Sequence, residues 1–276
     1  MAVKDSRGRF TNPRHVSVFR KAGGTAMADR KFPRKTLTFV LLVLTAGIMV
    51  LSASRSVREY LIVRLRGEKT VGDVIREKES AVKERLRPYL EKAGCSYPLR
   101  RITFLAFKQE KMLELWAEEA GAQRFIRSYP ILAASGHAGP KLREGDRQVP
   151  EGFYHIIALN PNGDFYLTML IDYPNSFDLK NAESEKRANP GGDICIHGKA
   201  ASIGCLAMGD TAIEELFILV ARAGAENVTV IISPNDLRNS EPAVAGQMSI
   251  SWVPGLYGNI KKQLSNYPSA KRAISP

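Results

Sequence analysis

Apolar residues follow three different patterns along this chain of 276 residues. Residues 36–54 (TLTFVLLVLTAGIMVLSAS) carry no charge, and a helix of that length just crosses a hydrocarbon core of about 30 Å. In residues 55–94, apolar positions recur at helical spacing among many charged residues. From residue 101 onward, short apolar runs alternate with turn residues. The pattern predicts a transmembrane anchor or signal segment, a helical juxtamembrane region and a sheet-rich domain.

The helical region and the sheet-rich domain are predicted in more detail. Residues 56–93 indicate two helices, interrupted near Gly67 and ending at Gly94, that pack on the following domain. A capping box, Thr211 to Glu214, predicts a helix that runs to about Ala223 and stops at Gly224. Strands are predicted at 102–107, 112–117, 124–134, 153–159, 165–171, 194–197 and 228–233, with hairpins joining the first two and the fourth to the fifth.

These elements give a mostly β (α+β) domain with one main helix over residues 95–238. Residues 239–276 form a C-terminal extension, in which residues 244–260 are apolar enough to fold back on the domain. We find no chemistry in this extension.

Charge determines the expected orientation of the N-terminal part. Residues 1–35 contain ten basic and two acidic residues, which accounts for +8 of the formal net charge of +12. The positive-inside rule therefore predicts that this disordered basic tail stays in the cytoplasm and that the chain beyond residue 54 is exported. The remaining +4 is ordinary for a soluble domain, so we expect no nucleic-acid partner.

Cleavage of the apolar segment is open. Ser52-Ala53-Ser54 has the small residues that a signal peptidase accepts, and Met27 would begin a leader of ordinary length. Counted from Met1, the basic region is too long for a cleaved signal, so we favour a single-pass anchor. Either outcome places the domain outside the cytoplasm.

Candidate chemistry is concentrated in residues 191–210. His197 ends a predicted strand, and Cys205 follows eight residues later. A catalytic cysteine needs a base and backbone N–H groups that hold an oxyanion. His197 could serve as the base, Cys205 as the nucleophile, and the Gly204-Cys205 turn could supply the amides. Taken singly, a cysteine is more often a small buried residue and a histidine a hydrogen-bonded core residue.

The other cysteines and histidines leave further interpretations open. Cys195, His197 and Cys205 could bind zinc, but neither CxxC nor HxxxH spacing is present, so we expect no metal and no cofactor. We expect Cys195 to pack or to lie beside the reactive pair. A disulfide between Cys95 and Cys195 is compatible with an oxidising compartment. His137 and His155 are assigned structural roles.

A backbone carbonyl of Gly198, Lys199 or Ser202 is expected to orient His197 through its other ring nitrogen.

Several sequence blocks together resemble the L,D-transpeptidase catalytic domain (YkuD-type), in its YafK-like branch. The likeness covers about residues 95–238, and its blocks are VPEGFYHI at 149–156, ASG at 134–136, GPK at 139–141, DYPN at 172–175, IHGK at 196–199 and Ser202-x-Gly204-Cys205. The resemblance implies a β-sandwich catalytic domain in the periplasm that acts on peptidoglycan stem peptides. It also implies that Cys205 forms a thioester and that His197 activates first the thiol and then the acceptor.

The resemblance assigns further roles residue by residue. Gly204 and the Cys205 amide match the oxyanion site, and Ser202 and Gly198 shape the turns. Tyr173, Asn175 and Lys199 are expected to contact substrate. The chain departs from the wider family in its short loop between His197 and Cys205, in Ile203 where a histidine is usual, and in Ala207 where an arginine is usual. The missing arginine bears on how a substrate carboxylate is recognised.

Three functions therefore remain open from sequence. The first is a cysteine acyl-transfer enzyme of the cell wall, with either transferase or hydrolase activity and with peptidoglycan, the inner membrane and a wall-attached lipoprotein as partners. The second is a non-catalytic, membrane-anchored peptidoglycan-binding protein. The third is a zinc protein.

Overall fold

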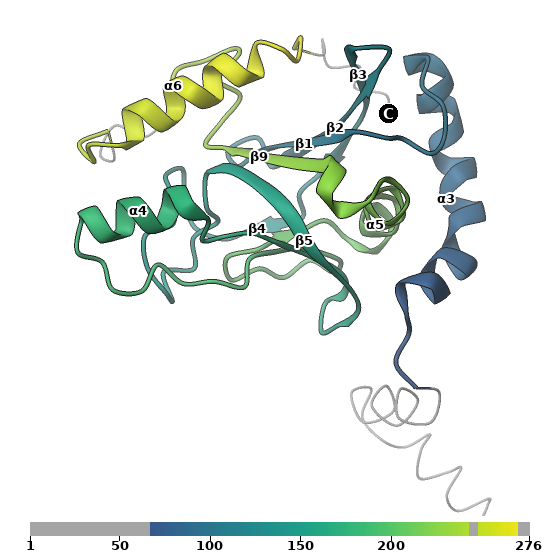
Figure 1. The fold of residues 1–276 in the computed structure, drawn as a ribbon, viewed down its shortest axis with the longest axis horizontal. Helices are drawn as coiled ribbons and strands as arrows, with labels where there is room; N and C mark the ends of the chain where they lie inside the picture. Colours follow the sequence, from purple (N-terminus) through teal and green to yellow (C-terminus); the bar gives the residue numbers. More distant parts are fainter. Residues whose placement is uncertain (1–66, 243–247, 270–276) are drawn as a thin grey trace, which may run out of the picture. The chain divides into compact units, whose positions relative to one another are not determined.

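The computed structural model describes residues 67–242 and 248–269. The strands are β1 (Ile102–Phe107), β2 (Met112–Glu119), β3 (Ala122–Pro130), β4 (Ala133–Ala134), β5 (Gly152–Gly163), β6 (Tyr166–Ile171), β7 (Cys195–His197), β8 (Leu206–Ala207) and β9 (Val228–Ser233). The helices are α3 (Val71–Ala93), α4 (Ser176–Ser184), α5 (Asp210–Ala223), α6 (Val253–Leu264) and the short 3₁₀ helix η1 (Ala225–Asn227). A sheet-rich domain with a few helices is thus confirmed (Figure 1).

The strands form one sheet in the order β3-β2-β1-β9-β5-β6-β7-β8-β4. β5 connects its two halves, because Gly152–His155 pairs with β9 and the rest of the strand pairs with β6. The partner changes after His155, and the register with β6 then shifts between Ile156 and Ala158. The two sheets of the expected sandwich are therefore joined into one, because β5 is long enough to pair with a different neighbour in each half.

Helices cover both faces of the strands around β1 (Figure 1). Phe104 and Ala106 contribute to a core shared with α3 and α5, whereas Leu105 and Phe107 contribute to a core shared with α6. Successive side chains of a strand point to opposite faces, so β1 is buried on both sides. α3 packs on the domain as expected, and part of the C-terminal extension folds back on it as α6.

The predicted elements need three corrections, and the first concerns the start of a helix. α3 ends at Gly94 in the left-handed conformation, as predicted. α5 instead begins at Asp210 with Gly209 as its N-cap and no side-chain cap, so the capping box at Thr211 was wrong. The Glu214 carboxylate bonds Lys78, Arg85 and Tyr166 and does not turn back to the helix start.

The second correction concerns the number of helices. α4 lies between β6 and β7 and was not predicted, because Ala182 is the one buried residue of this polar helix. The predicted strand 124–134 is also divided: β3 ends at Pro130 and the chain re-enters the sheet as β4.

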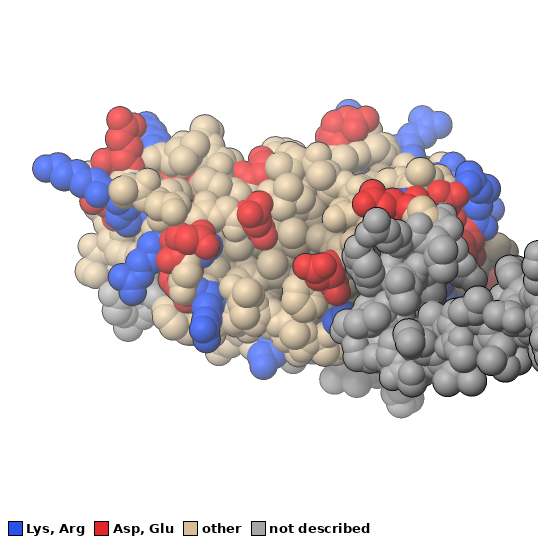
Figure 2. Space-filling model, turned by 90° about the horizontal axis from the view of Figure 1, so that it is seen from below, with Lys and Arg blue, Asp and Glu red and all other residues tan. Residues whose placement is uncertain are grey.

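The predicted basic tail, the transmembrane segment and the first helix of 56–93 lie outside the described residues. Within 67–242 and 248–269, no helix has the length and apolar character needed to cross a membrane. On the face shown in Figure 2, acidic and basic side chains are interspersed among uncharged residues, and neither sign forms a continuous patch.

Candidate active site

Two short neighbouring strands bring the predicted reactive residues together. β7 and β8 run parallel, with Ile196 opposite Leu206 and His197 opposite Ala207. The same register extended by one residue places Cys195 opposite Cys205. Residues two apart on one strand share a face of the sheet, as do directly paired residues on adjacent strands. Cys195, His197 and Cys205 therefore point to the same side.

One short hydrogen bond places a proton on Nδ1 of His197. His197 is buried, and its Nδ1 lies 2.6 Å from the Gly198 carbonyl oxygen. A carbonyl oxygen can only accept, so Nδ1 carries a proton and donates it. Nε2 is then the ring nitrogen that faces Cys205 and can exchange a proton with it. Gly198 thus supplies one of the carbonyls considered from sequence for orienting this ring.

The surroundings of Cys205 favour its thiolate. The Cys195 thiol donates a hydrogen bond to the Cys205 sulfur, His197 donates another, and the Cys195 backbone N–H lies 3.3 Å from Sγ. Together they lower the pKa of Cys205, and they outweigh burial, which acts in the opposite direction. The pKa of Cys195 is raised, because its thiol is the donor in this pair. These contacts favour the thiolate on Cys205 over the thiolate on Cys195.

Ser202 holds the turn that carries Cys205. Its Oγ accepts from the amides of Gly204, at 3.3 Å, and Cys205, at 3.1 Å, and donates to the Cys205 carbonyl at 2.6 Å. Gly204 has φ +136, in a region that favours glycine. The two amides expected to form the oxyanion site are thus directed at the Ser202 hydroxyl in this structure.

The chain segment that follows His197 passes close to the β5–β6 turn. A Cβ on Gly198 would lie 2.9 Å from the Phe165 carbonyl oxygen and 2.8 Å from an Asp210 carboxylate oxygen, which explains the glycine. The Phe165 ring lies against the imidazole, with centroids 4.8 Å apart. Sequence reasoning missed Phe165, since a half-exposed phenylalanine in a hairpin turn has no pattern that points to a distant histidine.

The three residues expected to contact substrate have partners within the protein. The buried Tyr173 donates through its hydroxyl to the Pro190 carbonyl at 2.9 Å. Asn175 caps α4 and also donates to Phe153 O. Lys199 is exposed, and its amide and ammonium groups both bond Asp210. These contacts hold Tyr173 and Asn175 in place within the fold; that they and Lys199 contact substrate stays a prediction.

The remaining cysteines and histidines are also placed. Cys95 follows α3 near Glu119 and Arg124, whereas Cys195 adjoins Cys205; all three cysteines are free, so the Cys95–Cys195 disulfide is not formed. Among the described residues, no group of three His, Cys, Asp or Glu side chains is arranged to hold a metal ion.

His137 and His155 bond local groups: His137 Nδ1 lies 2.8 Å from Ala138 O, and His155 Nδ1 lies 3.3 Å from an Asp172 carboxylate oxygen.

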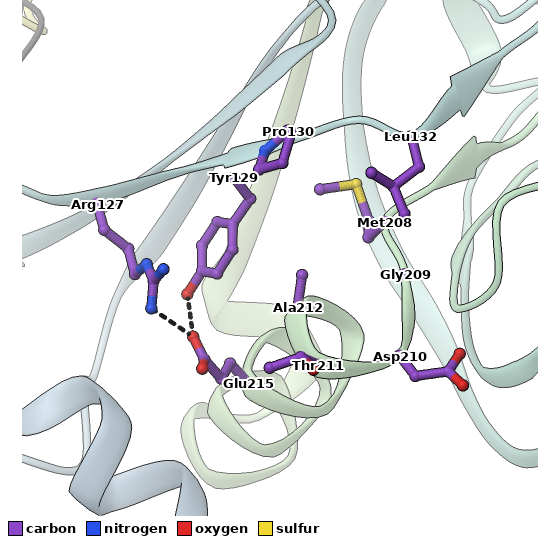
Figure 3. Close-up of a pocket in the computed structure, with 10 residues that line it drawn as sticks. All are labelled: Arg127, Tyr129, Pro130, Leu132, Met208, Gly209, Asp210, Thr211, Ala212 and Glu215. Atoms are coloured by element: carbon purple, nitrogen blue, oxygen red, sulfur yellow. Dashed lines mark hydrogen bonds and ion pairs between the residues drawn. The ribbon is translucent and has the colours of Figure 1, made fainter. Parts of the chain in front are cut away.

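A pocket of about 340 Å³ lies elsewhere, between the end of β3 and the start of α5. Figure 3 shows the Glu215 carboxylate accepting from Arg127 and Tyr129 at its wall. Arg85 also pairs with Glu215, so this buried carboxylate is held by three donors of the protein itself. The lining includes neither Cys205 nor His197, and we assign it no part in their chemistry.

Comparison with known proteins identifies a related family. Residues 103–232 match the YkuD family model, described as the L,D-transpeptidase catalytic domain. The resemblance is confirmed. Over 133 residues, the chain is 36% identical to the "Putative L,D-transpeptidase YafK" of Escherichia coli strain K12, covering 46% of this chain and 52% of that protein. The chain thus spans about half the length of the curated relatives it matches.

Solved structures give weaker similarities to the L,D-transpeptidase-like domain. The helical cell shape determining protein Pgp2 from Campylobacter jejuni is 22% identical, with 54% of this chain and 55% of that chain covered and a TM-score of 0.41. L,D-transpeptidase 1 from Mycobacterium tuberculosis is 11% identical, with 48% and 62% covered and a TM-score of 0.29. Similarity at this level carries no argument about activity.

Proposed function

We propose that this chain is a cysteine acyl-transfer enzyme of the cell wall, with Cys205 as nucleophile and His197 as base. The observation that carries the proposal is the arrangement of His197 beside Cys205: the ring donates through Nδ1 to Gly198 O and presents Nε2 to a thiol whose pKa is lowered. That arrangement lies within residues that match the L,D-transpeptidase catalytic domain. The proposed donor is a peptidoglycan stem peptide, whose bond after the L-centre of diaminopimelate is cleaved.

The reaction proceeds in two proton-balanced stages. The Cys205 thiolate attacks the carbonyl carbon, and the C–N bond breaks as His197 gives its Nε2 proton to the leaving amine. A thioester and a neutral imidazole remain. His197 then removes a proton from the acceptor as it attacks the thioester, and the thiolate is released. An amine acceptor gives a cross-link or an attached protein, and water gives hydrolysis.

The turn amides supply the oxyanion site in this proposal. The hydrogen bonds from Gly204 and Cys205 to Ser202 Oγ are long and join neutral groups. An oxyanion is a much stronger acceptor than a hydroxyl, so the same amides can transfer to it when the tetrahedral intermediate forms. Ala207 is fully buried in β8, so groups other than the usual arginine must bind the substrate carboxylate.

The proposed location follows from the sequence outside the described residues. An uncharged segment at 36–54, preceded by a net charge of +8, is expected to anchor the chain in the inner membrane. The catalytic domain would then work in the periplasm, where peptidoglycan and wall-attached lipoprotein are accessible.

The test is to incubate the full-length chain, purified in detergent, with tetrapeptide muropeptides and with a lipoprotein-linked wall fragment. Product masses distinguish a new cross-link from addition of water. We expect Cys205→Ala to abolish product formation while its circular dichroism is unchanged, and Cys95→Ala to retain activity. Full activity in Cys205→Ala would overturn the proposal. Binding of muropeptides without any product from the wild-type chain would identify a non-catalytic binding protein instead.

A further inference from the structure

Cys195 is a thiol that the proposed acyl transfer does not consume, yet it adjoins the nucleophile. Its backbone N–H lies 3.3 Å from Cys205 Sγ, and its thiol is hydrogen-bonded to that sulfur. A single oxygen also faces both thiols: Asp193 O lies 3.7 Å from Cys195 Sγ and 3.8 Å from Cys205 Sγ. The two sulfurs are therefore neighbours, and both lie next to the Asp193 carbonyl oxygen.

The backbone at this pair suits a disulfide. Neighbouring strands lie about 4.8 Å apart, and a disulfide joins Cα atoms about 4.4–6.8 Å apart. The β7–β8 register, extended by one residue beyond the Ile196–Leu206 pair, places Cys195 opposite Cys205, so both side chains lie on one face. The strands need not separate or slip for the two sulfurs to bond.

We propose that Cys195 is a resolving cysteine, so that oxidation of Cys205 by a hydroperoxide ends in a reversible Cys195–Cys205 disulfide. In the first step, the Cys205 thiolate attacks the distal peroxide oxygen, the O–O bond breaks, and the sulfenic acid of Cys205 and hydroxide (or an alkoxide) form. In the second, the Cys195 sulfur attacks Cys205 Sγ. The S–O bond breaks, and hydroxide leaves with the Cys195 proton as water. The hydroperoxide is the two-electron oxidant, and both cysteines are oxidised.

The consequence is a blocked but recoverable nucleophile. Without a resolving thiol, a sulfenic acid is oxidised further to sulfinic acid, which thiols do not reduce. With Cys195 in place, an external dithiol can attack the disulfide and return the Cys205 thiolate. Cys95 lies near Glu119 and Arg124, away from this pair, so it cannot substitute for Cys195.

The test treats the full-length chain with hydrogen peroxide, blocks free thiols with iodoacetamide and identifies the peptides by mass. We expect one peptide pair joined through Cys195 and Cys205, lighter by two hydrogen atoms, with Cys95 alkylated. Dithiothreitol should then restore iodoacetamide labelling of Cys205. Sulfinic acid on Cys205 with a free Cys195 would overturn the proposal.

Two variants test whether recovery of Cys205 depends on Cys195 in particular or on any second cysteine of the chain. After the same treatment, Cys195→Ser should recover less than about a tenth of its own untreated Cys205 labelling on reduction, because the sulfenic acid goes on to sulfinic acid. Cys95→Ser should recover as well as the wild type. Equal recovery in Cys195→Ser would exclude a resolving role. These readouts are masses and labelling, so they remain decisive even if the proposed acyl transfer is wrong.

Discussion

The reactivity of a single residue, Cys205, depends on which proton donors surround it. The pKa of Cys205 is lowered by hydrogen bonds from Cys195 and His197, whereas burial raises the pKa of Cys95. A thiolate is the form that reacts with an alkylating agent. We therefore expect the iodoacetamide rate at Cys205 to reach half of its plateau below pH of about 8.5, the value for a free thiol, and at Cys95 above it. Mass spectrometry of the two peptides across a pH series measures both rates in one sample.

The variant His197→Ala provides the control for this pH profile. It removes one donor to Cys205 and should move the Cys205 midpoint to higher pH, while the Cys95 profile stays in place. Coincident profiles for the two cysteines in the wild-type chain would show that Cys205 is not activated.

The sequence was enough to predict which residues are reactive, but it was not enough to predict the contacts that those residues make. Cys205 and His197 were identifiable because the sequence contains only three cysteines and four histidines, and because each of these two residues adjoins a glycine. The direction of the Gly204 and Cys205 amides toward Ser202 Oγ depends on backbone torsions, which the sequence of a turn does not specify. The pairing of Cys195 with Cys205 depends on the register of two very short strands.

At the scale of elements, the start of α5 is held by Asp210. Its carboxylate accepts from the Lys199 amide at 2.9 Å, so it joins the turn after His197 to the first turn of the helix. An acidic residue there also interacts favourably with the helix dipole. We expect Asp210→Ala to lower the free energy of unfolding by about 1 kcal/mol, measured by urea denaturation.

Thr211→Ala is the matched comparison one residue later. In the capping box predicted from sequence, the Thr211 side chain would accept a hydrogen bond from the helix backbone. Losing that bond would lower the free energy of unfolding by about 1 kcal/mol. Because the helix begins at Asp210 without a side-chain cap, we expect a change of less than about 0.5 kcal/mol. A larger loss in Thr211→Ala than in Asp210→Ala would contradict this helix start.

Strands were predicted correctly where the apolar segment was long, and they were missed where the strand has only two residues. β1 and β9 are apolar apart from Thr103, Thr229 and the final Ser233, and both were located to the residue. β4 and β8 have two residues each, too few for any period, and they are held by pairing with one another. The choice of β9 as the parallel neighbour of β1 brings together residues more than a hundred positions apart, which only the packed core determines.

For the whole molecule, one partly buried carboxyl, that of Asp178, makes stability depend on pH. Burial raises the pKa of Asp178 from 3.8 to about 6, against the hydrogen bonds it accepts from Asn175 and Tyr154. A carboxyl with a raised pKa binds more protons when folded, so stability falls as pH rises from about 4 to about 6 and the loss is complete above that range. At about 1.4 kcal/mol per pKa unit, the loss is at most about 3 kcal/mol.

Asp178→Asn should flatten this part of the stability curve, because the amide cannot ionise. Urea denaturation at several pH values between 4 and 7 measures the slope, and Asp164→Asn, at an exposed turn, should leave it unchanged. An unaltered slope in Asp178→Asn would assign the pH dependence to other groups.

A buried polar cluster connects α6 to Glu151, the residue before β5. Glu151, almost fully buried, accepts from the Gly139 amide and the Tyr257 hydroxyl, both at 2.7 Å, and pairs with Lys108 at 2.9 Å. Lys108 in turn donates to the Val149 carbonyl. α6 is therefore attached to the core by a charged acceptor as well as by its apolar face.

Tyr257→Phe tests the strength of that attachment, since it removes the hydroxyl and leaves one oxygen of a buried carboxylate without its donor. We expect the free energy of unfolding to fall by about 2 kcal/mol, because hydrogen bonds to charged groups contribute about 1.5–3 kcal/mol. Tyr267→Phe is the graded control, since its hydroxyl bonds the neutral Thr103 side chain at 3.1 Å, and a neutral pair contributes about 1 kcal/mol. Equal losses in the two variants would mean that the Glu151 charge adds nothing to holding α6 in place.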